Sequence, residues 1–153
     1  MLRIEPLDPR HNAVIAAAVL ELQRAAYTVE AELIGSVGIP ALQETLTELR
    51  AAPQRWLGAH DADGLVGAVA YERLADGTLD ICKLLVVPSA FRRGIGTALL
   101  DALDAVEPAE RIIVSTGTAN TPARRLYEGR GFVRMRDVEV APALWITQFE
   151  RCC

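Results

Sequence analysis

The sequence predicts an α/β fold in which helices cover both faces of a mixed, mostly antiparallel central sheet. Two observations lead to this expectation. Asp63-Gly64 and Asp76-Gly77 separate three apolar-rich runs, which is typical of an antiparallel meander. The third run ends in four consecutive apolar residues, 84–87, a pattern that favours a central strand buried on both faces. With 153 residues the chain has the size of one domain, to which we assign residues 1–153.

The first third of the chain is expected to supply one strand and two helices. Residues 2–7 alternate briefly, and Asp8-Pro9 then offers a capping residue and a proline suited to a first helical turn. The apolar residues that follow have the spacing of an amphipathic helix; they are Val14, Ile15, Ala18, Val19, Leu22 and Ala26. A second helical pattern opens at Pro40 and stops before Pro53.

The remaining two thirds should alternate between strands and helices. Strands are expected over residues 55–60, 65–74, 78–87, 111–116, 132–140 and 144–149. An amphipathic helix over 95–106 joins two of these strands, so the three elements should form a parallel crossover. Thr121-Pro122 begins another helix, and Gly131 ends it in a left-handed conformation.

Composition and charge exclude several classes of partner. Sixteen basic and twenty acidic residues give a net charge of -4 without a long basic run, so no nucleic-acid partner is expected. The apolar run 13–20 is too short to span a bilayer, and no signal peptide is recognised. Three cysteines without a spaced framework favour a reducing cytoplasm. Arg is far more frequent than Lys and Ala is abundant, which is typical of a GC-rich bacterial genome.

No metal site or activated nucleophile is expected. His11 and His60 are isolated, without cysteine or carboxylate ligands at metal-binding spacings. Cys82 lies within a predicted strand and is interpreted as a small buried hydrophobe. Ser36 lacks the first glycine of a nucleophile elbow.

The stretch from residue 84 to 97 carries the most chemical information. A buried strand leads through a short turn into a helix start that contains Gly94 and Gly96. Unpaired amides, the helix dipole and small residues together predict a phosphate cradle, to which Arg92 and Arg93 add positive charge.

Two well-known phosphate motifs do not fit this stretch. A P-loop would need a lysine after its second glycine, where Thr97 stands. The dinucleotide fingerprint would need a third glycine at position 99, which is Leu99. ATP, GTP and NAD are therefore disfavoured as ligands.

Two blocks of the sequence resemble motifs of the GNAT superfamily of N-acetyltransferases. Val86-x-Pro88, followed by Arg-Arg-Gly-Ile-Gly-Thr-Ala-Leu-Leu over 92–100, is similar to that superfamily's acetyl-CoA motif. The pattern Asn120-x-x-Ala123-x-x-x-Tyr127-x-x-x-Gly131-Phe132 resembles its next motif. Together they cover residues 84–132, about a third of the chain. The resemblance implies a cleft where strand 78–87 splays from strand 111–116, with acetyl-CoA as cosubstrate and no metal.

The resemblance also implies a role for each motif residue. The backbone of Leu84, Leu85 and Val86 would pair with the pantetheine arm. The pyrophosphate would be wrapped by Arg92, Arg93, Gly94, Ile95, Gly96 and Thr97. Asn120 would contact the cofactor, and Tyr127 would protonate the departing thiolate.

The base and the acceptor stay open. Asp80 lies where some histone-type members carry a glutamate base, and Glu72 or water are alternatives. Ser115 stands where ribosomal-protein N-terminal acetylases carry a catalytic glutamate, which argues against that subclass. Phe91 replaces a common Gln or Arg. Glu30 lies two residues from Glu32, and this acidic pair is interpreted as a solvated helix face or as a feature that favours a cationic amine.

The implied reaction is direct acetyl transfer to a primary amine in a ternary complex, without a covalent enzyme intermediate. The acceptor is a small molecule or a peptide. The alternative hypothesis is a noncatalytic acyl-CoA-binding or regulatory domain with the same fold. A homodimer through the C-terminal strands is a further expectation.

Overall fold

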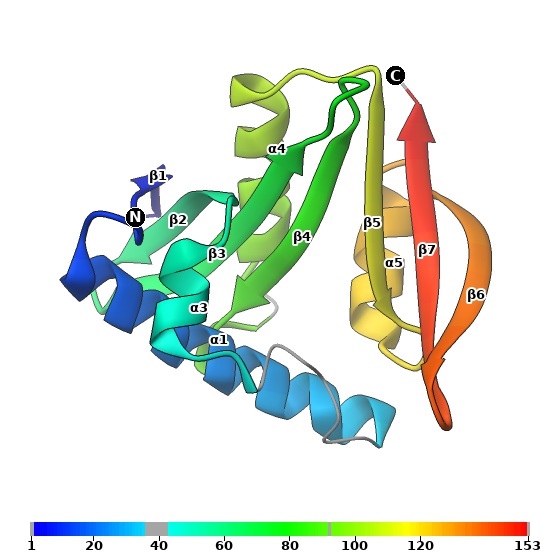
Figure 1. The fold of residues 1–153 in the computed structure, drawn as a ribbon, viewed down its shortest axis with the longest axis horizontal. Coiled ribbons are helices and arrows are strands. Elements are labelled where there is room, and N and C mark those ends of the chain that lie inside the picture. Colours follow the sequence, from blue (N-terminus) through cyan, green and yellow to red (C-terminus); the bar gives the residue numbers. More distant parts are fainter. Residues whose placement is uncertain (1, 36–42, 92, 153) are drawn as a thin grey trace.

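Seven strands form one mixed sheet in the order β1-β2-β3-β4-β5-β7-β6 (Figure 1). The computed structural model describes residues 2–35, 43–91 and 93–152. The strands are β1 (Arg3–Leu7), β2 (Arg55–Asp61), β3 (Gly64–Arg73), β4 (Leu79–Val86), β5 (Arg111–Gly117), β6 (Val133–Ala141) and β7 (Leu144–Cys152). Only β4 and β5 pair in parallel, so the sheet is mixed and mostly antiparallel, as predicted.

Helices pack on both faces of this sheet. They are α1 (Ala13–Ile34), α3 (Leu46–Ala51), α4 (Ile95–Val106) and α5 (Thr121–Gly129), and a short 3₁₀ turn, η1, covers Pro88–Ala90. Helices α1 and α3 lie on one face, and α4 and α5 lie on the other (Figure 1). Each face has its own apolar core: Val19 and Leu49 belong to the α1 side, and Leu99 and Tyr127 belong to the α4 side. The predicted central strand β4 is covered on both faces, since Leu85 joins the first core and Leu84 packs against the second.

Two helix starts differ from the sequence prediction, and a third prediction falls outside the described residues. The first helix begins at Ala13 rather than at Pro9, because the Asn12 side chain accepts hydrogen bonds from two backbone N–H groups. Asp8 instead accepts bonds from His11 and closes a turn. Pro40 lies outside the described residues, and α3 begins at Leu46 behind a capping box on Thr45.

The second difference concerns α5: the sequence offers Thr121 before Pro122 as its capping residue, but Asn120 caps the helix. The Asn120 side chain accepts a hydrogen bond from the Ala123 N–H at 3.3 Å, and proline stands in the first turn. Gly131 has the predicted left-handed backbone, with φ of 88°.

Strands β4 and β5 are joined at one end and separate at the other. Their pairing runs only from Leu79 and Ile112 to Ile81 and Val114. At that point β4 carries a bulge: Ala70 pairs with Lys83 and Tyr71 with Ile81, so Cys82 has no partner on β3. A bulge bends its strand and increases its twist. The second half of β4 therefore leaves β5, and Figure 1 shows the two strands diverging.

In the described part of the chain, no helix combines the length and the apolar character that crossing a bilayer requires.

Candidate active site

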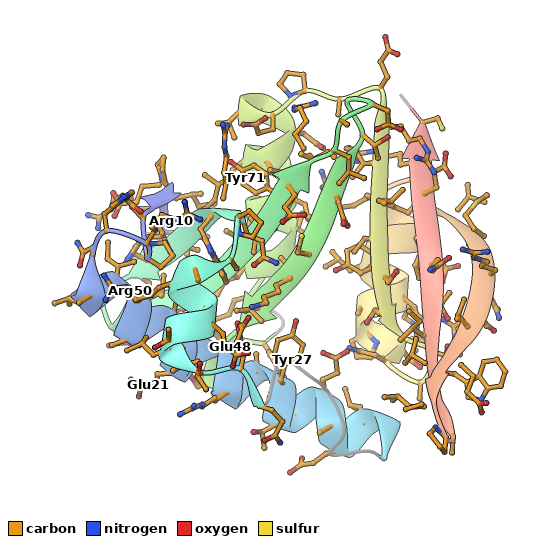
Figure 2. The ribbon with its side chains drawn as sticks, viewed as in Figure 1. Arg10, Glu21, Tyr27, Glu48, Arg50 and Tyr71 are labelled. Atoms are coloured by element: carbon orange, nitrogen blue, oxygen red, sulfur yellow. The ribbon has the colours of Figure 1, made fainter. Side chains whose placement is uncertain are left out.

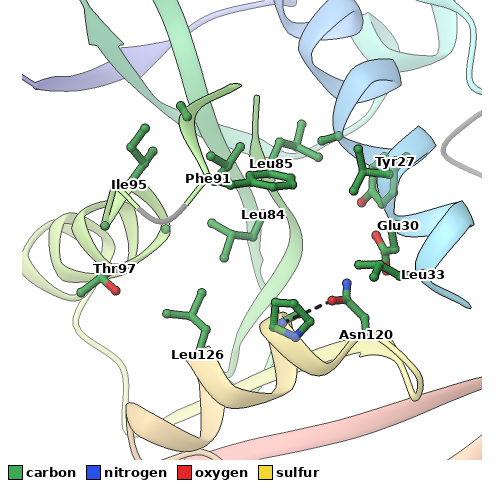
Figure 3. A pocket seen from close by; sticks show the side chains of 18 residues that line it. Tyr27, Glu30, Leu33, Leu84, Leu85, Phe91, Ile95, Thr97, Asn120 and Leu126 are labelled. Atoms are coloured by element: carbon green, nitrogen blue, oxygen red, sulfur yellow. Dashed lines mark hydrogen bonds between the residues drawn. The ribbon is translucent and has the colours of Figure 1, made fainter. Parts of the chain in front are cut away.

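A cavity of about 540 Å³ opens where β4 leaves β5 (Figure 3). We call it the larger cavity. Its walls come from the second half of α1, the end of β4, the start of α4 and the start of α5. Eight of the predicted cofactor-binding residues line it: Leu84, Leu85, Val86, Gly94, Ile95, Gly96, Thr97 and Asn120. Residues from two separate sequence motifs therefore meet in one place.

Helix α4 presents its N-terminus to the larger cavity. Gly94 is its N-cap in the left-handed conformation, with φ of 75°, and glycine has no side chain with which to cap the first turn. The first N–H groups of a helix have no partner inside the helix. A Cβ at Gly96 would lie 3.1 Å from a Leu126 methyl group and 3.8 Å from one of Leu84, so the backbone is approachable there because no side chain is present. This arrangement fits an anionic group such as a phosphate.

The edge of β4 that faces the cavity is unpaired. Leu84 and Leu85 form ladder pairs with Val69 and Ala68 of β3, but the ladder to β5 ends at Ile81. Backbone N–H and C=O groups on a free edge can pair with an extended ligand as an added strand.

A smaller cavity of about 200 Å³ adjoins the larger one. Both cavities share Tyr27, Glu30, Leu84, Asn120 and Ala123 among their lining residues. The smaller cavity also extends between β4 and β5, where Cys82, Lys83 and Ser115 line it. The two cavities thus meet where β4 and β5 separate beyond Ile81 and Val114, a place that we call the β4–β5 splay.

Tyr127 lines the smaller cavity and not the larger one. It is only 4% exposed, and its ring centroid lies 5.6 Å from that of Phe132 and 6.0 Å from that of Phe149. Burial, together with the nearby negative charge of Glu30, raises the pKa of Tyr127. The phenol therefore holds its proton at neutral pH.

Glu30 projects from α1 into the junction of the two cavities, facing Asn120 (Figure 3). It is half-buried. Burial raises the pKa of its carboxyl, and the polar groups of Asn120, Gly117 and Thr116 oppose that change because they favour the charged form. Glu32, its partner in the acidic pair, is exposed and is not part of either wall.

Tyr27 is one helical turn before Glu30, and its side chain rises from α1 toward the sheet (Figure 2). It lines both cavities. Burial, with a smaller contribution from Glu30, raises the pKa of its phenol. The sequence prediction missed Tyr27; its three-residue spacing to Glu30 placed both on one helix face, but no local pattern indicated what that face meets.

Asp80 lies outside the lining of both cavities. It is half-buried on β4. One of its carboxylate oxygens, a carboxylate oxygen of Glu72 and the Sγ of Cys82 lie within 4.8 Å of one another. Burial, and next the charge of Glu72, raise the pKa of Asp80. Burial raises the pKa of the Cys82 thiol to about 12, so this thiol is not an activated nucleophile.

Arg93 is placed differently from the glycines of the motif. Arg93 forms an ion pair with Asp61 at 3.0 Å and does not line the larger cavity. Arg92 lies outside the described residues. Phe91 is 44% exposed and belongs to the wall of the larger cavity.

A buried ion pair supports the α1 side of the site. Lys83 Nζ lies 2.5 Å from Glu44 Oε1 and 2.8 Å from Gln23 Oε1. The same ammonium lies 5.5 Å from the centroid of a Trp56 ring. These contacts join β4 to α1 and to the segment before α3.

A profile of the acetyltransferase (GNAT) domain matches residues 52–134, more than half of the chain. The UPF0157 protein YqkA of Bacillus subtilis (strain 168) is 42% identical over 139 residues. That match covers 90% of this chain but only 40% of the length of YqkA.

Solved structures share the fold over nearly the whole chain. The PaiA N-acetyltransferase of Thermoplasma acidophilum, in complex with coenzyme A, superposes with a TM-score of 0.77 at 14% identity and covers 100% of this chain and 99% of its own. YncA of Salmonella typhimurium, with its cofactor acetyl-CoA, gives 0.72 at 15% identity and covers 99% and 94%. With the profile match, the splayed strands and the glycine helix start, these findings show that the chain belongs to the GNAT acetyltransferase family.

Proposed function

We propose that this protein transfers an acetyl group from acetyl-CoA to a primary amine of a small molecule or a peptide. One observation carries the proposal: the N-terminus of α4 and the free edge of β4 line the same cavity. The first suits a phosphate and the second suits an extended, amide-containing chain, and coenzyme A contains both. The similar PaiA and YncA structures, which hold coenzyme A and acetyl-CoA, support the same ligand class.

The two walls of the larger cavity, from β4 and from the start of α4, would bind different parts of coenzyme A. The backbone of Leu84, Leu85 and Val86 would bind the pantetheine arm. The residues from Arg92 to Thr97 would bind the pyrophosphate, chiefly through backbone N–H groups, because Arg93 is engaged with Asp61. Acetyl-CoA supplies a thioester carbonyl for an amine to attack.

Tyr127 is the proposed acid. Its raised pKa keeps the phenol protonated until negative charge develops on the leaving sulfur. Transfer in a ternary complex is favoured because the Cys82 thiol, which lines the smaller cavity, has a pKa of about 12 and stays protonated. The smaller cavity is then the place for the acceptor amine.

A thermal-shift titration of the chain with acetyl-CoA, CoA, ATP and NADH in parallel tests the ligand. A ligand at a hundredfold excess over its Kd adds about 2.7 kcal/mol to the free energy of unfolding. We expect both CoA species to stabilise the protein and the two nucleotides to have no effect. A folded sample that responds to neither CoA species would contradict the proposal.

A thiol-release assay with acetyl-CoA and a panel of primary amines then tests the reaction. Amine-dependent release of CoA is the expected result. Stabilisation by acetyl-CoA without release by any amine would favour the noncatalytic acyl-CoA-binding domain instead.

A further inference from the structure

We propose that Glu30 is the residue that takes the proton from the acceptor amine. This assignment rests on the proposed function. Of the residues shared by the two cavities, Glu30 alone carries a carboxylate. The amine loses its proton while its nitrogen bonds to the thioester carbon, so the group that takes this proton must lie where the acceptor meets the thioester. The junction of the two cavities is such a position.

Polar groups from the opposite side of the splay face the Glu30 carboxylate. Thr116 and Gly117 at the end of β5 and Asn120 before α5 line the smaller cavity together with Glu30. The Asn120 side chain caps α5 through its oxygen, and its amide lies opposite Glu30 (Figure 3). A carboxylate that is enclosed by such groups from two sides of the splay is positioned for proton transfer.

The titratable groups around Glu30 differ in which protonation state they favour. Tyr27, Cys82, Lys83 and Tyr127 face the smaller cavity from α1, β4 and α5. Burial raises the pKa of both tyrosines and of Cys82, and Lys83 is paired with Glu44. Glu30 is the carboxylate among these groups. A protonated phenol beside a carboxylate is the pattern of an acid and a base in one site.

The proton balance follows from these two roles. The acceptor nitrogen forms a bond to the acetyl carbonyl carbon, and the bond from that carbon to sulfur breaks. Glu30 receives the proton lost by the nitrogen, and Tyr127 gives its hydroxyl proton to the sulfur. Water returns the proton from Glu30 to the Tyr127 oxygen. The products are an acetamide and CoA thiol, and no oxidant or further reactant is needed.

Asp80 is the competing base, and the two carboxylates differ in position. Asp80 is absent from both cavity walls, whereas Glu30 belongs to both. The neighbours of Asp80 are Glu72 and Cys82, which contribute no hydrogen bond that would orient its carboxylate toward the splay.

The variant Glu30→Gln tests the assignment. It preserves the size of the side chain and an oxygen that can accept from Asn120. We expect kcat for amine-dependent CoA release to fall by about 10²-fold or more, and the decline of the wild-type rate toward low pH to disappear. The stabilisation by acetyl-CoA in a thermal shift should stay at the wild-type value. The matched control is Glu21→Gln, an exposed position on the same helix, which should leave all three measurements unchanged.

A second variant separates positioning from proton transfer. Thr116→Val removes one donor and keeps the carboxylate, so kcat should fall by only about tenfold while the low-pH decline persists with a shifted midpoint. If Glu30→Gln retained the wild-type kcat, or lost acetyl-CoA stabilisation along with activity, the assignment would be wrong. It would equally fail if Asp80→Asn, and not Glu30→Gln, abolished the low-pH decline.

Failure of the proposed function has a different signature. A wild-type chain that releases no CoA with any amine would overturn the acetyltransferase proposal and, with it, the role of Glu30. An active wild type together with an equally active Glu30→Gln variant would overturn the role of Glu30 alone.

Discussion

The two walls of the β4–β5 splay are built in different ways. The wall formed by β4, α4 and the start of α5 offers mainly backbone and small or apolar side chains, with Gly94, Gly96 and the free edge of β4 at its centre. The α1 wall offers functional side chains, namely Tyr27 and Glu30, supported by the Lys83–Glu44 pair. The first kind of wall suits a ligand with phosphates and amides. The second kind suits chemistry on a particular acceptor.

Among the substitutions that test this difference between the two walls, Tyr127→Phe has the largest expected effect, and it acts on kcat. It removes the proposed acid and keeps the ring that packs against Phe132 and Phe149. We expect kcat to fall about 10²-fold with a nearly unchanged melting temperature and unchanged acetyl-CoA binding. Steady-state CoA release measures kcat, a circular-dichroism melt measures the melting temperature, and the thermal shift with acetyl-CoA measures binding. An unchanged kcat would mean that the phenol is only a core aromatic.

Lys83→Met tests whether the α1 wall depends on side-chain contacts. The variant leaves Glu44, whose side chain is 21% exposed, without its ammonium partner. Breaking such a pair costs about 3 kcal/mol, which urea unfolding would detect. The double variant Lys83→Met with Glu44→Gln removes the uncompensated charge and should recover most of the loss. A single variant as stable as the wild type would show that the pair does not hold this wall.

The difference between the two walls also explains which parts of the site could be predicted from the sequence. The glycine helix start and the strand before it are contiguous in the chain, so local chemistry indicates a phosphate cradle, and Gly94 and Gly96 do line the larger cavity. Glu30 and Thr116 are far apart in sequence, and only the folded sheet brings them together. A pattern within α1 cannot reveal that contact.

Local ambiguity accounts for the wrong start of the first helix. Asp8 and Asn12 are both good capping residues, and the choice depends on His11, which engages Asp8. Asp80 is predicted as a base because it lies where some histone-type members of the superfamily carry a glutamate base, and in the structure it lines neither cavity. Its catalytic role stays a prediction.

Gly94→Ala tests whether the wall at the start of α4 binds acetyl-CoA through its backbone. A left-handed conformation costs a residue with a Cβ about 1–2 kcal/mol, so both stability and the affinity for acetyl-CoA should decrease. Gly77→Ala is a matched control, since Gly77 has φ of 88°, no atom within 4 Å of an added Cβ, and a place in the β3–β4 turn. It should lose similar stability while the Kd for acetyl-CoA is unchanged. Equal loss of affinity in both variants would show that Gly94 acts through overall stability.

Asp80→Asn has the smallest expected effect, and it should raise the free energy of unfolding at pH 7 rather than lower it. Burial and the charge of Glu72 raise the pKa of Asp80 in the folded state, so its ionisation costs stability as pH rises through that raised pKa. The variant should be more stable than the wild type at pH 7, by less than about 1 kcal/mol because solvent screens a half-exposed group. The difference should vanish near pH 3, where the carboxyl is neutral. Urea unfolding at both pH values checks this, and a less stable variant at pH 7 would indicate a favourable partner for the charge.

Isothermal titration of acetyl-CoA into the wild type, Gly94→Ala and Glu30→Gln tests the division between the two walls most directly. We expect tight binding by the wild type, a higher Kd for Gly94→Ala, and a Kd for Glu30→Gln equal to that of the wild type. A Glu30→Gln variant that loses acetyl-CoA while Gly94→Ala retains it would contradict the assignment of the α4 wall to the cofactor and of Glu30 to the acceptor.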